Sequence, residues 1–266
     1  MIAGAARALG ALMAGSVIAA CASPYEEALL IGHRGSPVQA PENSFEGFEL
    51  AYHQGADGLE FDVQWTQDDR NVVMHDDTLD RTTTCTGPVR ERTLDDLRSC
   101  TLENGESVAL LEEMLAVFAP KFEVMFLEIK IPDATPPAEV IEAQTDDAID
   151  LVLQSGYANR VVIISYDEVA LRRIAERADE GIVGGWDEMS ADGIADANRH
   201  GLRWVLMPSR VVEPWMRDVL EGLDKRLAIY QVITPTELAR SLDAGAEAVM
   251  TDDVPVMAAM LGRKPR

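Results

Sequence analysis

The sequence predicts an α/β fold, the TIM (β/α)8 barrel, with a small insertion after the second strand. Short apolar runs alternate with amphipathic, helix-like stretches along most of the chain, and this alternation is typical of a parallel sheet covered by helices. Most runs are almost continuously hydrophobic, as in strands that are buried on both faces. A doubly wound open sheet would produce a similar alternation and remains the alternative.

Nine apolar runs are candidate strands, one more than a barrel needs: residues 28–32, 58–63, 72–75, 124–129, 161–165, 182–186, 204–207, 227–232 and 248–251. Six amphipathic stretches are candidate helices: residues 44–53, 110–118, 138–153, 168–178, 214–220 and 236–244. The run at 72–75 follows the second strand too closely for an intervening helix, so we assign it to an extension of the second β/α connection. Asn43 and Glu46 have the spacing of a helix N-cap and its third residue, which predicts an Asn cap on the first helix.

The first twenty residues have the features of a targeting segment. An apolar, small-residue run over residues 9–20 ends directly before Cys21, which is typical of a secretory signal rather than a membrane span. A Cys at this position resembles the bacterial lipoprotein signal; a plain signal cleaved just beyond it is the alternative. We therefore expect residues 1–20 to be removed and residues 21–266 to form one domain. That domain would be exported and held at the cell envelope by acyl chains on Cys21, facing the periplasm or the exterior.

The segment from about residue 76 to residue 107 breaks the strand–helix rhythm, and we interpret it as an insertion over one barrel loop. It contains Cys85 and Cys100, which are more often bridged than free in an exported protein. The alternative, a metal site, lacks neighbouring Cys or His partners. The sequence therefore predicts a disulfide that closes a short loop and stabilises the fold by roughly 3 kcal/mol on the chain-entropy model.

Composition limits the possible partners. The 266 residues are 47% hydrophobic, which suits one large domain with a sizeable core. The formal net charge of -23 argues against nucleic acid or an anionic membrane as an electrostatic partner. A phosphate-bearing small molecule remains compatible with this charge if the site itself holds a metal and local cations. The oligomeric state does not follow from the sequence.

Carboxylates recur at the ends of two candidate strands. Glu60 and Asp62 are two residues apart, so both side chains lie on the same face of a strand. Glu128 and Lys130 repeat this arrangement on another strand. Inward-facing carboxylates repel one another unless a cation neutralises them. A salt-bridge network would explain either pair alone, but three carboxylates at neighbouring strand ends favour a site for a hard divalent cation.

His33 and His75 each end an apolar run beside these carboxylates. Two imidazoles on neighbouring strands suit a general acid and a general base, because imidazole titrates near neutral pH. Arg34 offers a planar fork suited to phosphate, and Lys130 offers a point charge. His53, in a helix, and His200, in a surface-like turn, receive no catalytic role.

These segments resemble the signature of the glycerophosphodiester phosphodiesterase family. The resemblance is carried by Ile31-Gly32-His33-Arg34-Gly35, Pro41-Glu42-Asn43-Ser44, Leu59-Glu60-Phe61-Asp62-Val63, Val72-Val73-Met74-His75-Asp76 and Leu127-Glu128-Ile129-Lys130. It implies a TIM barrel with an insertion after the second strand. It also implies that Glu60, Asp62 and Glu128 hold a divalent cation, usually Ca²⁺ and in some members Mg²⁺. His33 and His75 would be the acid–base pair, with Arg34 and Lys130 on the phosphate.

The implied reaction is hydrolysis of a small-molecule glycerophosphodiester to glycerol 3-phosphate and an alcohol. Two alternatives remain: a phospholipase D-like enzyme that forms a cyclic phosphate from lysophospholipids, and a non-catalytic phosphodiester-binding lipoprotein. The second is disfavoured because none of the implied residues is missing. The chain departs from the family pattern at Tyr230–Ile233, at Asp253–Pro255 and at Ser165-Tyr166. These departures concern the pocket for the glycerol or the alcohol, and therefore the head-group preference.

Overall fold

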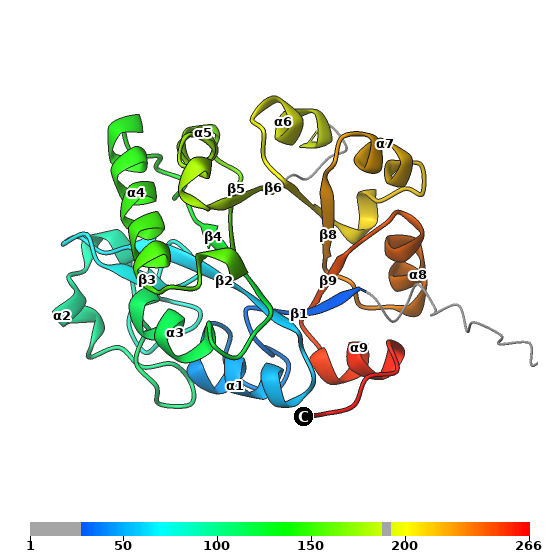
Figure 1. Cartoon of the computed structure of the whole chain (residues 1–266). Coiled ribbons are helices and arrows are strands. Elements are labelled where there is room, and N and C mark those ends of the chain that lie inside the picture. The colour runs from blue at the N-terminus through cyan, green and yellow to red at the C-terminus, as the bar shows by residue number, and fades with distance from the viewer. Residues whose placement is uncertain (1–27, 188–192) are drawn as a thin grey trace, which may run out of the picture.

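The computed structural model describes residues 28–187 and 193–266, so the expected lipidation site at Cys21 lies outside the described residues. Eight parallel strands form a barrel (Figure 1): β1 (Leu29–His33), β2 (Gly58–Trp65), β4 (Val124–Ile129), β5 (Val161–Ser165), β6 (Val183–Asp187), β7 (Trp204–Pro208), β8 (Arg226–Tyr230) and β9 (Ala248–Thr251). β1 pairs with β9 on one side and with β2 on the other. The sheet is therefore closed, which confirms the TIM barrel and excludes the open doubly wound sheet.

The ninth apolar run is not a barrel strand. β3 (Asn71–Val73) pairs antiparallel with the end of β2, where Val73 lies opposite Val63 and Asn71 opposite Trp65. The run therefore extends the second β/α connection, as the short spacing after β2 predicts. It also carries the chain from the barrel into the inserted segment.

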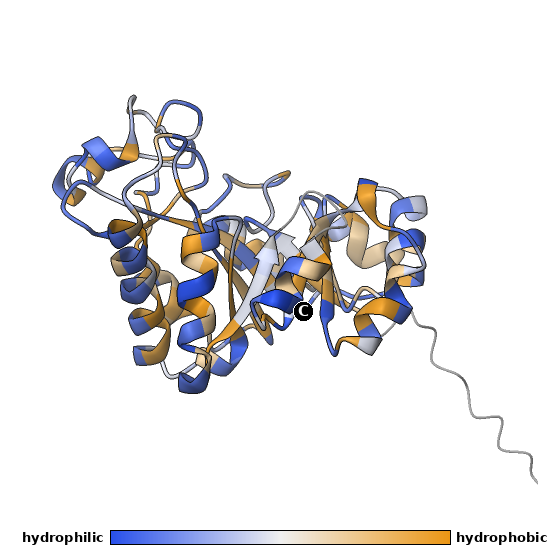
Figure 2. Cartoon of the chain, turned by 90° about the horizontal axis from the view of Figure 1, so that it is seen from above, coloured by the Kyte–Doolittle hydropathy of each residue, from blue (hydrophilic) through white to orange (hydrophobic). Residues whose placement is uncertain are grey.

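The principal helices lie outside the barrel (Figure 1). They are α1 (Phe45–His53), α3 (Leu111–Phe118), α4 (Ala138–Gln154), α5 (Glu168–Glu176), α6 (Gly193–Arg199), α7 (Met216–Gly222), α8 (Pro235–Asp243) and α9 (Val254–Met260). Figure 2 shows hydrophobic segments along the strands and more hydrophilic residues on the outer helices and loops. The sequence did not predict α6 or α9: α6 is short and contains Gly, Asp and Asn, and α9 has no charged residue to mark an outer face. Among the described residues, no helix is long and apolar enough to cross a membrane.

The first helix begins one residue later than an Asn cap would require. Ser44 is the N-cap, and its hydroxyl accepts a hydrogen bond from the Gly47 backbone N–H. Asn43 instead has a positive φ of 55° and directs its side chain towards β2. The predicted Asn43–Glu46 capping pair is therefore wrong, because the Asn43 amide is used by another contact inside the barrel.

Two apolar cores lie on the two faces of the barrel wall. The outer one fills the space between strands and helices. The inner one fills the barrel interior with side chains that include Ile31, Phe126, Ile164, Leu206 and Met250. The inner core fills the barrel interior. A ligand can therefore bind beyond this core, at the carboxyl ends of the strands.

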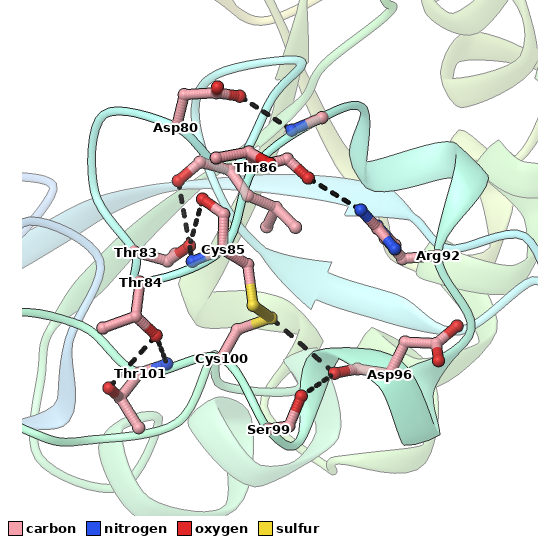
Figure 3. The surroundings of a disulfide bond; sticks show 12 residues. Asp80, Thr83, Thr84, Cys85, Thr86, Arg92, Asp96, Ser99, Cys100 and Thr101 are labelled. Atoms are coloured by element: carbon pink, nitrogen blue, oxygen red, sulfur yellow. Dashed lines mark hydrogen bonds between the residues drawn. A yellow bond between two sulfur atoms is a disulfide. The ribbon is translucent and has the colours of Figure 1, made fainter.

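The inserted segment has a small core of its own. It contains a 3-10 turn, η2 (Val89–Glu91), and the short helix α2 (Leu94–Leu97), and buried Leu79, Val89 and Leu97 pack together within it. The predicted disulfide between Cys85 and Cys100 is present, with a Cα–Cα distance of 5.4 Å (Figure 3). The disulfide therefore ties the insertion to itself rather than to the barrel.

Candidate active site

The candidate active site is formed by the inward-facing side chains that follow the inner apolar core on each strand. Successive side chains of a strand alternate between its two faces. On β1, Ile31 belongs to the inner core and His33 is the next inward position; on β4, Phe126 is followed in the same way by Glu128. The register places His33 opposite Glu60. It also places Asp62 opposite Glu128, so these polar side chains form one layer.

Three of these side chains form a buried carboxylate cluster. Glu60, Asp62 and Glu128 each offer an oxygen atom within 4.8 Å of the others. Glu60 Oε1 and Asp62 Oδ1 are buried without a hydrogen-bond partner. Burial raises the pKa of Glu60 well above its usual value, and the adjacent charges of Asp62 and Glu128 raise it further. A bound divalent cation would relieve both the repulsion and the missing contacts, so this donor set fits a hard cation.

Two basic side chains flank the carboxylate cluster. Lys130 Nζ donates to Glu128 Oε1 at 2.9 Å and lies 3.9 Å from Asp62 Oδ1. Arg34 Nε lies 3.5 Å from Asp62 Oδ2. Burial by itself would raise the pKa of Asp62, but the charges of Arg34 and Lys130 and a hydrogen bond from Asn43 hold it below its usual value. The lowered pKa favours an ionised Asp62, which lies between the side chains of Arg34 and Lys130.

The turn after β1 positions Arg34 and Asn43. Arg34 has a φ of 54°, and its backbone N–H donates to Glu60 Oε2 at 3.0 Å. Gly35 follows with a φ of 94°, a value that favours glycine. Asn43 Nδ2 donates to Asp62 Oδ2 at 2.8 Å. The turn thus supplies one donor to each carboxylate of β2.

Both histidines line the same cavity, and each has a carboxylate on Nδ1. His33 Nδ1 lies 2.6 Å from Asp252 Oδ1, and His33 Nε2 lies 3.7 Å from Glu60 Oε2. His75 Nδ1 lies 2.7 Å from Asp76 Oδ1. If each carboxylate accepts a hydrogen bond from Nδ1–H, the proton stays on Nδ1 and the Nε2 atom is left for chemistry. Burial lowers the pKa of His75. The charges of Lys130 and Arg34 lower it further, whereas Asp62 and Asp76 act in the opposite direction without reversing the shift.

The cavity has a volume of about 250 Å³ and two contrasting sides. The polar side is formed by six of the predicted site residues: His33, Arg34, Glu60, His75, Glu128 and Lys130. The other side is formed by Ile164, Leu206, Tyr230 and Met250, with Tyr166 at its border. Such a cavity suits a small ligand with a charged group at one end and a short carbon skeleton.

The structure brings together all seven residues predicted for the metal, the acid–base pair and the phosphate. Sequence reasoning did not give Asp252 a role beside His33, and it named Tyr166 and Tyr230 only as departures from the family pattern that concern the pocket. A usable signal was present, because each stands two positions after an inward-facing core residue, namely Met250, Ile164 and Ala228. No comparable signal marks Asn43, whose role depends on a turn rather than on a strand.

The two other histidines lie away from the cavity. His53, at the end of α1, is exposed and pairs with Glu49 at 3.1 Å. His200 lies in a turn after α6, as predicted, but its ring stacks on Trp186 with the centroids 5.3 Å apart, and its side chain is only 14% exposed. Packing against an aromatic side chain explains the burial of His200 without a catalytic role.

The residues of the cavity lie within a segment that matches a known protein family. The model of the Glycerophosphoryl diester phosphodiesterase family matches residues 33–256. The chain belongs to this family. The match begins at His33 and includes every residue of the phosphodiesterase cavity described above, as well as the inserted segment.

Relatives of this phosphodiesterase match over nearly its full length. The glycerophosphodiester phosphodiesterase of Caldanaerobacter subterraneus subsp. tengcongensis is 29% identical over 239 residues, which cover 85% of this chain and 94% of the relative. Among solved structures, an Oleispira antarctica phosphodiesterase in complex with the product sn-glycerol-3-phosphate has a TM-score of 0.77 at 20% identity, with 88% of this chain and 96% of that chain covered. A glycerophosphodiester phosphodiesterase from Thermotoga maritima has a TM-score of 0.69 at 20% identity, with 88% and 98% covered. The structural likeness supports the shared fold.

Proposed function

We propose that this phosphodiesterase hydrolyses glycerophosphodiesters to glycerol 3-phosphate and an alcohol, with a divalent cation and with His33 and His75 as the acid–base pair. The observation that carries the proposal is that both imidazoles and the three-carboxylate cluster lie in or against one small cavity. The Oleispira antarctica relative, which shares the fold, binds sn-glycerol-3-phosphate as its product.

The charges of the cavity suit a phosphodiester. Three carboxylates and two basic side chains leave one negative charge, and a divalent cation would change this to one positive charge. A phosphodiester carries one negative charge and would neutralise it. We assign the cation to Glu60, Asp62 and Glu128, with Ca²⁺ or Mg²⁺ as candidates, and the phosphate oxygens to Arg34 and Lys130. When bound, the cation would stabilise negative charge on the reacting phosphate.

The two imidazoles differ in their surroundings. The lowered pKa of His75 favours a neutral ring at pH 7, which suits the base that removes a proton from the nucleophile. His33 lies between the carboxylates of Asp252 and Glu60. With the base role given to His75, we assign the protonation of the leaving alcohol to His33, the other imidazole of the cavity.

The test is release of glycerol 3-phosphate from glycerophosphocholine and glycerophosphoethanolamine with Ca²⁺, with Mg²⁺ and with EDTA. We expect release only with a cation, and a loss of several orders of magnitude in turnover for His33→Ala and for His75→Ala. His53→Ala is the matched control, because it removes an exposed imidazole from the same fold. Full activity in both cavity variants would contradict the assigned roles. Phosphorus NMR of the products would reveal a cyclic phosphate if the phospholipase D-like alternative held.

We further propose that the protein is exported and anchored through a lipid on Cys21. The disulfide supports an oxidising compartment. Incorporation of a labelled fatty acid into the wild type, and its absence in Cys21→Ser, would be the expected result. Labelling of both proteins or of neither would contradict the anchor.

Such an anchor would favour soluble substrates over membrane lipids. Ala28 precedes β1 at the N-terminal end of the barrel, whereas the cavity opens at the opposite end. The seven residue-to-residue steps from Cys21 to Ala28 span at most about 25 Å. An eight-residue strand such as β2 has about this length, so the tether is too short to pass around the helices and bring the mouth to the anchoring membrane. We therefore favour released glycerophosphodiesters over lysophospholipids as substrates.

A further inference from the structure

Arg81, in the inserted segment, is bound by two carboxylates outside the cavity. Its Nε and Nη2 atoms donate to Asp76 at 2.6 and 2.8 Å. Its Nη1 and Nη2 atoms donate to Glu42 at 2.6 and 2.7 Å. A guanidinium engaged by two bidentate carboxylates has a fixed plane and little freedom to move. Arg81 does not line the cavity.

Each of these carboxylates also contacts a side chain of the cavity. Asp76 Oδ1 is the partner of His75 Nδ1 at 2.7 Å. Glu42 Oε1 accepts from Arg34 Nη1 at 3.3 Å. A continuous chain of contacts therefore leads from His75 through Asp76, Arg81 and Glu42 to Arg34. Its members come from the connection after β1, from the segment after β3 and from the insertion.

The backbone around Arg81 is well fixed. Leu79 is fully buried in the core of the insertion. Its N–H donates to Gly87 O at 3.0 Å, and its carbonyl accepts from the Thr83 N–H at 3.1 Å. Thr83 Oγ1 in turn accepts from the N–H of Cys85, whose disulfide is drawn in Figure 3. The core and hydrogen bonds of the insertion thus fix the backbone that carries Arg81.

We propose that Arg81 is a positioning residue that holds His75 and Arg34 in register through Asp76 and Glu42. The proposal rests on the proposed function, because His75 and Arg34 are given their roles there. The physical reason is that Asp76 orients the His75 ring only while the Asp76 carboxylate itself is fixed. Besides its contact with His75, this carboxylate accepts hydrogen bonds from Arg81. Loss of Arg81 would remove the bidentate partner of both carboxylates, so that Asp76 would keep its contact with His75 and Glu42 its contact with Arg34, each with more freedom to rotate.

The first experiment compares Arg81→Ala and Arg81→Lys with the wild type on glycerophosphocholine. We expect kcat to fall roughly 10- to 100-fold in Arg81→Ala, the range typical of residues that orient a functional group. Arg81→Lys would recover little, because an ammonium group does not bind two carboxylates bidentately. Added guanidinium at millimolar concentration would restore part of the kcat of Arg81→Ala. The matched control is Arg90→Ala, which removes from the same insertion an arginine that donates to the Ala134 carbonyl.

The second measurement does not depend on activity. Nitrogen NMR of the wild-type His75 ring would show the proton held on Nδ1, and in Arg81→Ala the ring would exchange between tautomers. The proposal is overturned if Arg81→Ala keeps kcat within twofold and the His75 tautomer unchanged, or if its loss of kcat accompanies general unfolding without guanidinium rescue. If the wild type does not cleave glycerophosphocholine but the tautomer responds to Arg81, the proposed substrate fails and the positioning role stands.

Discussion

His33 Nδ1 lies 2.6 Å from Asp252 Oδ1, although 219 positions of sequence separate the two residues. β1 and β9 are neighbouring strands, so closure of the barrel brings the last strand to the first histidine. The hydrogen bond with His33 is the main reason that the pKa of Asp252 lies below its usual value. Asp252 is thus an ionised partner that can orient His33.

Asp252→Asn is predicted to lower kcat by roughly 10- to 100-fold, because an amide can present an N–H to Nδ1 and favour the wrong tautomer. KM should change much less, since Asp252 does not line the cavity. The measurement is steady-state kinetics beside Asp253→Asn, which alters the neighbouring acid that bonds Gln39. Equal kinetics in the two variants would argue that Asp252 does not position His33.

Glu60→Gln and Glu128→Gln are predicted to abolish stabilisation by Ca²⁺ or Mg²⁺. A ligand at one hundred times its Kd stabilises the native state by about 2.7 kcal/mol, which corresponds to a shift of several degrees in Tm for a domain of this size. The measurement is thermal unfolding with each cation and with EDTA. Glu221→Gln, an exposed change on α7 near the opposite end of the barrel, should keep the full shift. A cation-dependent shift that survives in both cavity variants would place the site elsewhere.

Removal of Arg81 is predicted to reduce the loss of unfolding free energy that occurs as the pH falls below about 4. Hydrogen bonds from Arg81 lower the pKa of Asp76, with a further contribution from His75. Burial opposes the shift at Glu42, but Arg81 and Arg34 outweigh it and lower that pKa as well. Carboxyls with depressed folded pKa values contribute stability that is fully present above their unfolded values of about 4 and is lost as the pH falls further.

Urea unfolding in EDTA at pH 7 and near pH 3.5 tests this sign. The difference in unfolding free energy between wild type and Arg81→Ala should be largest at pH 7 and should shrink at the lower pH. Arg90→Ala provides the baseline for loss of an arginine from the insertion. A difference that stays constant or grows towards acid would contradict the assignment.

The disulfide is predicted to stabilise the fold by roughly 3 kcal/mol, because it closes a loop with a sequence separation of 15 residues. The double variant Cys85→Ser/Cys100→Ser should lose this amount in urea unfolding. A reducing agent should bring the wild type to the same value and leave the variant unchanged. A variant that unfolds at the wild-type urea concentration would show that the small core of the insertion is sufficient on its own.

The barrel and the centre of its site could be predicted from local patterns. Near-continuous apolar runs identified all eight barrel strands within a few residues. The two-residue period placed Glu60 and Asp62 on one face of their strand, and it placed Glu128 and Lys130 together in the same way on another strand. These features depend on the spacing of neighbouring residues along one strand, which is why the sequence alone determined the fold class and the polar layer.

Tertiary structure decided the partners of those residues. Asp252 meets His33 only because the barrel closes between β9 and β1, and Arg81 meets Asp76 and Glu42 only because the insertion lies against the loop that follows β1. Asn43 leaves the cap position predicted for it because a buried oxygen of Asp62 accepts its amide. Each contact joins segments distant in sequence or turned by a loop, where no periodicity constrains the side chain. The sequence by itself therefore determined which groups form the site, and the closure of the barrel and the path of its loops decided what holds them in place.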